Sequence, residues 1–270
     1  MTRPPFRLLL VLVLGPWSLV LPAAASAPAV SLAAASDLIS CLDALNAAFL
    51  QIENPKSKIE NPTTLTVVTG SSGNFFAQIK NGAPYDIFLS ADLSYPRALI
   101  DARLADPASL TPYAIGRLVL WTTRTDLALT DLATTLRDPR VKKFAIANPA
   151  HAPYGRAAQQ TLASLGLSAA AAPKLVLGEN IAQTAQFVQS GNADSGLVAL
   201  SLVLSPTLRE RGHWQEIPAT LHAPLEQAAV LTTRGAANPA AARYLVFLRS
   251  PAARKIFERF GFVLPTEPAR

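Results

Sequence analysis

Ser71 and Ser72 stand between a β-branched run and a segment with helical spacing. Residues 64–69 are Thr, Leu, Thr, Val, Val and Thr, which favour a strand, and we expect a helix from Phe75. Such a helix points unpaired N–H groups and the positive end of its dipole at the strand tip. With two hydroxyls beside these amides, the available chemistry is the binding of a small anion. The alternative is that both serines only cap the helix and bind water.

Three more predicted strands run into a loop and a helix start in the same way. They are followed by Ser36 and Asp37 after residues 30–35, by Tyr154 after residues 143–147, and by Asn180 and Ile181 after residues 174–177. Asn180 can either cap its helix or hold in place the residues that contact a ligand. The loop at Ser71 has neither the GxxxxGK[ST] nor the GxGxxG pattern of nucleotide-binding loops, so the expected guest is small.

Strands alternate with helices along the chain, which predicts an α/β protein whose mostly parallel sheets are flanked by helices. We expect a long strand over residues 113–122 to carry the chain into a second lobe. The predicted domains are residues 26–112 plus 227–270 for lobe 1 and residues 113–226 for lobe 2. A ligand cleft between two such lobes would close by a hinge motion.

The N-terminus has the features of a secretory signal over residues 1–25. Arg3 and Arg7 precede an apolar stretch that is too short to anchor the protein in a membrane, and small residues follow. Removing this segment lowers the formal charge from +6 to +4. The basic residues are scattered, with no run longer than Lys142 and Lys143, so neither nucleic-acid binding nor membrane insertion is expected.

Other chemistries have little support in the sequence. Cys41 is the single cysteine, so no internal disulfide can form, and we place it in the core. His151, His213 and His222 fall in predicted loops, where surface roles are expected, and His213 with Glu216 does not make a zinc site. The segment 52–62, which contains IENP twice, is predicted to be a surface loop of unknown role.

Long stretches of the chain resemble one family, the periplasmic molybdate-binding proteins that deliver to an ABC transporter. The resemblance covers nearly all of the chain after the signal, in the order of the family. It implies a two-lobed type II periplasmic-binding fold that holds an oxyanion by hydrogen bonds, with no catalysis and no cofactor. The stretches that carry it are LAAASDL (32–38), TGSSGNFFAQIKNGAPYDIFLSAD (69–92), TPYAIGRLVLW (111–121), NPAHAPYGRAA (148–158), KLVLGENIAQTAQ (174–186), GLVALS (196–201) and SPAARKIFERFGFVLP (250–265).

Carried over residue by residue, the resemblance implies molybdate contacts from hydroxyl and amide groups. The contacts would come from Ser36, Asp37 and Ser72 in lobe 1 and from the backbone amides of Tyr154 and Ile181 in lobe 2, with Ser71 and Asn180 in support. Some members place a tyrosine hydroxyl where this chain has Ala199, a bond that the amide of Asp37 could replace. Molybdenum would enter only as the oxyanion, without direct protein ligands.

Molybdate at neutral pH is a tetrahedral dianion that only accepts hydrogen bonds, so a matching site presents donors and needs no Arg or Lys. Asp37 is the exception, because a carboxylate repels a dianion. We expect its side chain to turn away and cap the helix. Alternatively, it accepts a hydrogen bond from a protonated ligand such as hydrogen phosphate. If Tyr154 contributes its amide alone, Tyr154→Phe should change little.

The expected function is therefore that of a monomeric periplasmic protein that binds molybdate, with tungstate as a second ligand, and delivers it to an ABC permease. One alternative is the same fold serving another tetrahedral oxyanion, sulfate or phosphate. Another is a secreted serine hydrolase. Against the hydrolase, the chain lacks the GxSxG and SxxK motifs that would activate Ser36 or Ser72 as a nucleophile.

Overall fold

The structure is a computed structural model that describes residues 29–55 and 62–266. The predicted signal segment, 1–25, and residues 56–61 of the predicted loop lie outside the described residues. Residues 52 and 53 of the predicted loop belong instead to a helix, α1, which ends at Glu53. Across the described ranges, no helix combines the length and the apolar character needed to cross a bilayer.

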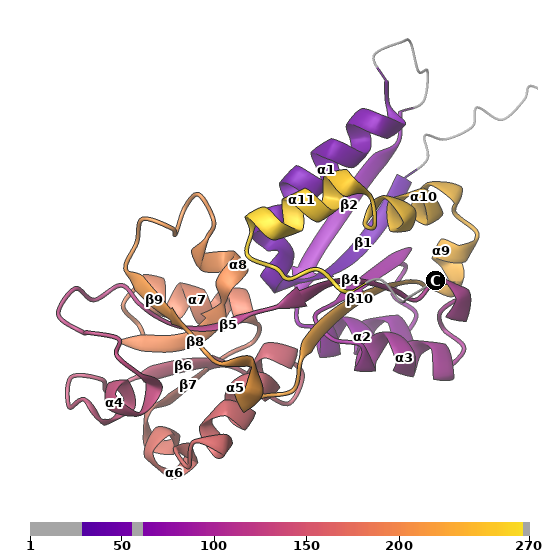
Figure 1. Ribbon diagram of the computed structural model, residues 1–270. Coiled ribbons are helices and arrows are strands. Elements are labelled where there is room, and N and C mark those ends of the chain that lie inside the picture. Colours follow the sequence, from indigo (N-terminus) through magenta and orange to yellow (C-terminus); the bar gives the residue numbers. More distant parts are fainter. Residues whose placement is uncertain (1–28, 56–61, 267–270) are drawn as a thin grey trace, which may run out of the picture.

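Two five-stranded sheets form the two lobes (Figure 1). The first sheet has the order β2-β1-β3-β10-β4, and the second has the order β7-β6-β8-β5-β9. The strands of the first are β1 (Ala29–Ala35), β2 (Thr64–Gly70), β3 (Ile87–Ser90), β4 (Thr111–Gly116) and β10 (Leu225–Leu231). Those of the second are β5 (Leu118–Thr122), β6 (Phe144–Ala147), β7 (Leu175–Gly178), β8 (Ser195–Ala199) and β9 (His213–Glu216).

Both sheets are mixed but mostly parallel, as expected, because in each sheet one strand, β10 or β5, runs against the other four. In each, the first three strands in the order given above pair in parallel and the last two pair antiparallel. The antiparallel part arises because β10 and β5 are connected to the other lobe and run against their neighbours. The predicted two-lobed α/β architecture is confirmed.

The chain crosses between the lobes at Arg117. The predicted strand over 113–122 is in fact two strands, β4 in the first sheet and β5 in the second, so residues 113–116 pair with lobe 1. The chain returns to lobe 1 after β9, where the sequence predicts a loop and the structure has a strand. Its alternating half-buried and exposed residues, His-Trp-Gln-Glu, pair only with β5 at the sheet edge.

Helices cover both faces of the first sheet. In Figure 1, α1, α10 and α11 lie over one face and α2 and α3 under the other. The predicted apolar stripe of α1 is buried: Cys41, Leu42, Leu45 and Phe49 all face the core. The helices of this lobe are α1 (Ile39–Glu53), α2 (Ser72–Lys80), α3 (Ser94–Asp101), α9 (Thr233–Ala236), α10 (Pro239–Phe247) and α11 (Pro251–Arg259).

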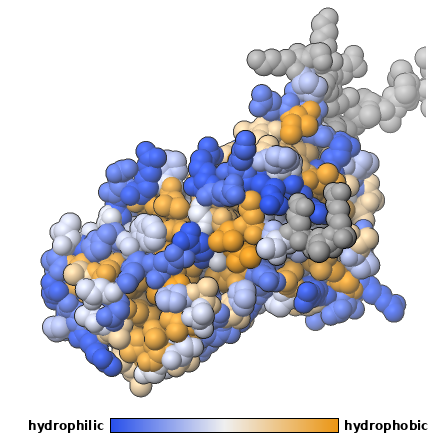
Figure 2. All heavy atoms as spheres, in the orientation of Figure 1, coloured by the Kyte–Doolittle hydropathy of each residue, from blue (hydrophilic) through white to orange (hydrophobic). Residues whose placement is uncertain are grey.

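The second lobe packs around a single apolar core. Its helices are α4 (Leu132–Arg137), α5 (Pro153–Ser164), α6 (Ser168–Ala171), α7 (Ile181–Gln189) and α8 (Leu200–Val203). Ala35 and Ala91 of the first lobe belong to this core as well, so the lobes are packed together at the strand ends. On the outer face seen in Figure 2, apolar side chains appear in small groups between hydrophilic ones.

Candidate anion-binding site

A small closed cavity lies where the two lobes meet. The space open to the centre of a water-sized sphere is about 10 Å³, close to the least that holds one water molecule. It is lined by Ala35, Ser36, Asp37, Gly70, Ser71, Ser72, Ala91, Ala152, Pro153, Tyr154 and Ile181. Six of the seven predicted site residues are therefore brought together; Asn180 stands behind them, where its side chain caps α7 by accepting from the Gln183 amide at 3.0 Å.

The lobe 1 half of the cavity is built at the carboxyl ends of β1 and β2, which are neighbouring parallel strands. Ser36 and Asp37 form a single 3₁₀ turn (Ser36–Leu38) that leads into α1. Ser71 is the N-cap of α2, and its Oγ accepts from the Asn74 amide at 3.3 Å. Ser72 is the first residue of α2, one turn earlier than the predicted start at Phe75.

The hydroxyls of Ser36 and Ser72 each accept a backbone N–H, which leaves their own protons to donate. Ser72 Oγ accepts from the Ala91 amide at 3.0 Å, and Ser36 Oγ accepts from the Ala182 amide at 3.4 Å. Both side chains are almost completely buried. A hydroxyl that is fixed in this way presents a donor to the cavity.

The lobe 2 half offers backbone amides. Tyr154 and Ile181 stand in the first turns of α5 and α7, where N–H groups have no carbonyl partner inside the helix. Gly155 lets α5 approach β6, since a Cβ there would lie 2.3 Å from the Ala147 carbonyl oxygen. Both helices direct the positive ends of their dipoles at the cavity.

The Asp37 carboxyl does not cap a helix, so that expectation is wrong. Its Oδ2 accepts hydrogen bonds from Gln227 Nε2 and, at 3.2 Å, from the Tyr154 hydroxyl. Its Oδ1 is buried without any partner. Because burial outweighs these two bonds, the pKa of Asp37 is raised to about 6. Burial and the nearby Asp37 charge raise the pKa of Tyr154 well above its usual range, so its hydroxyl remains a donor.

Contacts between the lobes close the rim of the cavity. Arg156 of α5 forms an ion pair with Asp92 and donates to the Tyr95 hydroxyl at 3.1 Å. The Gly73 amide donates to the His151 carbonyl at 2.8 Å, and a Cβ at Gly73 would lie 2.7 Å from that oxygen. The two lobes therefore touch at the rim, and most residues that line the cavity are buried.

Sequence reasoning missed the roles of Gln227 and His151. Gln227 is a fully buried polar residue in β10, and the sequence gives no signal of this burial because the neighbouring Glu226 is also polar and is exposed. His151 was expected to have a surface role, but its Nδ1 contacts Ser71 Oγ across the cleft at 3.0 Å. Ala199 ends β8 and is not among the residues that line the cavity.

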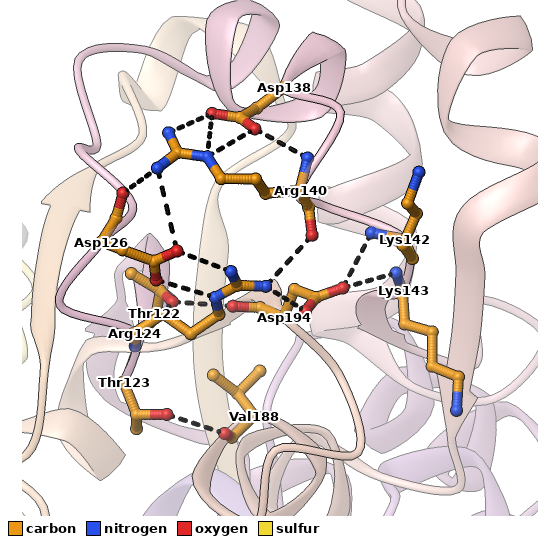
Figure 3. A network of polar contacts seen from close by, with 10 residues as sticks. All are labelled: Thr122, Thr123, Arg124, Asp126, Asp138, Arg140, Lys142, Lys143, Val188 and Asp194. Carbon is orange, nitrogen blue, oxygen red and sulfur yellow. Dashed lines mark hydrogen bonds and ion pairs between the residues drawn. The ribbon is translucent and has the colours of Figure 1, made fainter.

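Two other features look functional but do not converge on the cavity. Arg124 and Arg140 form an ion-pair network with Asp126, Asp138 and Asp194 (Figure 3). Asp194 also accepts the amides of Lys142 and Lys143, just before β6 begins, which places the network at the opposite end of the strand from the site. The network therefore links the loop that follows β5 to the loops that precede β6 and β8.

The larger hollow, with a volume of about 910 Å³, lies between β4 and the α10–α11 connection. Its lining includes Val246, which is 73% exposed, and Glu226. It shares no residue with the small cavity, and no helix N-terminus with free amides faces it from the opposite lobe. We therefore place the site at the small cavity.

Comparisons with known proteins agree with this architecture. Residues 30–263 match the model of a family described as bacterial extracellular solute-binding protein. The chain is 40% identical over 210 residues to the molybdate-binding protein ModA of Azotobacter vinelandii, covering 77% of this chain and 83% of that protein. It is also 40% identical over 200 residues to ModA of Rhodobacter capsulatus, covering 74% and 77%.

A solved structure shows the same fold. The Azotobacter vinelandii periplasmic molybdate-binding protein superposes with a TM-score of 0.79 at 32% identity, covering 88% of this chain and all of that one. The resemblance inferred from the sequence motifs is thereby confirmed, and so is the type II periplasmic-binding architecture. The chain belongs to the family of bacterial extracellular solute-binding proteins, and molybdate-binding proteins are among its relatives.

Proposed function

We propose that this protein captures molybdate in the closed cavity and delivers it to the permease of an ABC transporter. The observation that carries the proposal is the donor set: two serine hydroxyls and the free amides of opposed helix N-termini converge on one small cavity. This cavity has room for about one water molecule, so the lobes must part to admit molybdate. The relatives named as molybdate-binding proteins support the choice of anion.

The proposed contacts are the hydroxyls of Ser36 and Ser72 and the amides of Asp37, Tyr154 and Ile181. Ser71 and Asn180 act in support, because the oxygen of each caps the helix that presents a donor. Each hydrogen bond to a charged ligand contributes roughly 1.5 to 3 kcal/mol. The helix dipoles share the neutralisation of the dianion, so no Arg or Lys is needed in the cavity.

Tungstate should bind comparably, since it has nearly the same shape and charge. Sulfate is smaller, so the donor groups of the two lobes would have to move closer together to contact it. An ionised Asp37 would oppose any dianion, because two unit charges 4 Å apart interact by about 4 kcal/mol in a typical protein environment. Hydrogen phosphate could instead donate its proton to Asp37, and phosphate therefore remains the alternative ligand.

The proposed setting is the periplasm, reached through the signal segment over residues 1–25, with the mature protein acting as a monomer. Membership of an extracellular solute-binding family supports export. We propose no catalytic role and no cofactor. Within the described part of the chain, no group of three His, Cys, Asp or Glu side chains could hold a metal ion.

One observation favours a hydrolase as the second candidate. Ser71 Oγ contacts His151 Nδ1 at 3.0 Å, and His151 Nε2 lies 3.7 Å from Glu179. Ser71 Oγ is already occupied as the cap of α2, however, and Glu179 is held by Asn74 at 2.6 Å. Turnover of simple esters that disappears in Ser71→Ala would establish this function.

Titration calorimetry on the purified mature protein tests the proposal. We expect tight, saturable binding of one molybdate and of one tungstate, and much weaker binding of sulfate. A protein that binds none of the oxyanions, or that binds sulfate or phosphate more tightly than molybdate, would contradict the assignment.

A further inference from the structure

We infer that Asp37 meets the bound oxyanion as a neutral carboxylic acid that donates its proton from Oδ1, so that it determines which anions the site accepts. The inference rests on the proposed function and extends it, because it assigns a side-chain donor that the amide contacts do not provide. It starts from the unequal surroundings of the two carboxyl oxygens.

Oδ2 is occupied by donors. Gln227 Nε2 and the Tyr154 hydroxyl both donate to it, from β10 and α5 respectively. The Gln227 side chain is oriented by Tyr113, whose hydroxyl donates to Gln227 Oε1 at 2.9 Å. A proton on Asp37 would clash with these donors if it sat on Oδ2, so it must sit on Oδ1.

Oδ1 is the oxygen left for the guest. It is buried and has no hydrogen-bond partner, and Asp37 is one of the residues that line the cavity. If Oδ1 were unprotonated, two groups that only accept would face each other, the carboxylate and the dianion. A proton on Oδ1 converts this free acceptor into another donor.

No positive charge near Asp37 stabilises its ionised form. The titratable groups around it are Tyr154 from α5, Tyr113 from β4 and Cys41 from α1, all neutral at pH 7. At the rim, Arg156 pairs with Asp92, and His151 lies near Glu179; no Lys, Arg or His among the described residues contacts the Asp37 carboxyl. The burial that raises the pKa of Asp37 to about 6 acts before any anion binds, and a bound dianion raises this pKa further.

Proton uptake follows from this arrangement. At pH 7.5 Asp37, with a pKa of about 6, is ionised before the anion binds, and the binding of molybdate takes one proton from solvent to form the acid. The affinity should therefore fall about tenfold for each pH unit through the alkaline range, as proton linkage requires. Molybdate itself does not change its protonation over this range.

The test is titration calorimetry at pH 7.5 in buffers of different ionisation enthalpy, which counts protons directly, together with affinities from pH 6.5 to 8.5. The wild type should take up close to one proton per molybdate. Asp37→Asn replaces the acid O–H by an amide N–H, so we expect no uptake, a flat pH profile and an affinity within a few-fold of the wild type at pH 7.

Two further variants separate the alternatives. Asp37→Ala removes the donor and should bind more weakly at every pH, without proton uptake. His151→Gln removes the histidine that contacts Ser71 in the cleft and should leave the uptake in place. Wild-type binding without proton uptake, or uptake that persists in Asp37→Asn, would overturn the inference and leave the proposed function standing. Absence of molybdate binding by the wild type at every pH would overturn both.

Discussion

The two halves of the cavity provide hydrogen-bond donors in different ways. In the proposed site, lobe 1 contributes the hydroxyls of Ser36 and Ser72 together with Asp37, whereas lobe 2 contributes only the backbone amides of Tyr154 and Ile181. The lobe 1 half can therefore be changed by ordinary substitutions. The lobe 2 half depends on where two helices begin, and only a substitution that removes an N–H will alter its donors.

The largest effect is expected from removing both hydroxyls of the lobe 1 half. Ser36→Ala with Ser72→Ala deletes two charge-assisted bonds, about 3 to 6 kcal/mol together, so molybdate affinity should fall roughly 100- to 10,000-fold by calorimetry. Ser195→Ala is the matched control, because Ser195 Oγ is also buried but has no partner. Unchanged affinity in the double variant would show that lobe 1 does not bind through its hydroxyls.

Ile181→Pro tests the lobe 2 half without touching a polar side chain. Ile181 is the first residue of α7, where proline is tolerated, and Asn180 before it is extended (φ −149°, ψ 177°) as proline requires. The lost amide should weaken molybdate binding roughly 10- to 100-fold. Ile181→Val keeps the N–H and should bind like the wild type, and equal affinities in the two variants would contradict the backbone role.

Tyr154→Phe examines a buried side chain that joins the two halves. The sequence alone predicts little change in molybdate affinity, but in the structure the Tyr154 hydroxyl donates to Asp37 Oδ2. Loss of one neutral hydrogen bond of about 1 kcal/mol should weaken binding roughly two- to tenfold, while the amide remains. The ratio of affinities measured at pH 7 decides between the two expectations, and a ratio near one would restore the first.

The smallest effect is expected at the rim. Arg156→Ala removes the ion pair with Asp92 and the contact with Tyr95 across the lobes. Because this ion pair is partly exposed, it contributes at most about 1 kcal/mol, and the affinity for molybdate should fall less than roughly fivefold. Arg140→Ala breaks a comparable ion pair inside lobe 2 and should leave affinity unchanged. Stopped-flow measurement should show that the lower affinity of Arg156→Ala comes from faster dissociation of molybdate.

Much of the fold could be predicted because local patterns were strong. The β-branched strands and the apolar stripe of α1 follow from periodicity and propensity. Four predicted strand ends, each followed by a polar loop, indicated where a ligand site would form. The prediction failed where tertiary context decides. The break at Arg117 separates two strands that read as one apolar run, and the edge strand β9 is too polar to be recognised without its partner.

The sequence alone indicated the kind of chemistry proposed for the site, since serine hydroxyls and helix starts at successive strand ends can offer donors to an anion. The tertiary structure decided what surrounds Asp37. Its neighbours Tyr154 and Gln227 are 117 and 190 residues away along the chain, and only the folded chain brings them to one carboxyl oxygen and leaves the other free. The reason is physical: burial and hydrogen-bond partners set the protonation of a carboxyl, and both depend on residues that are distant in sequence.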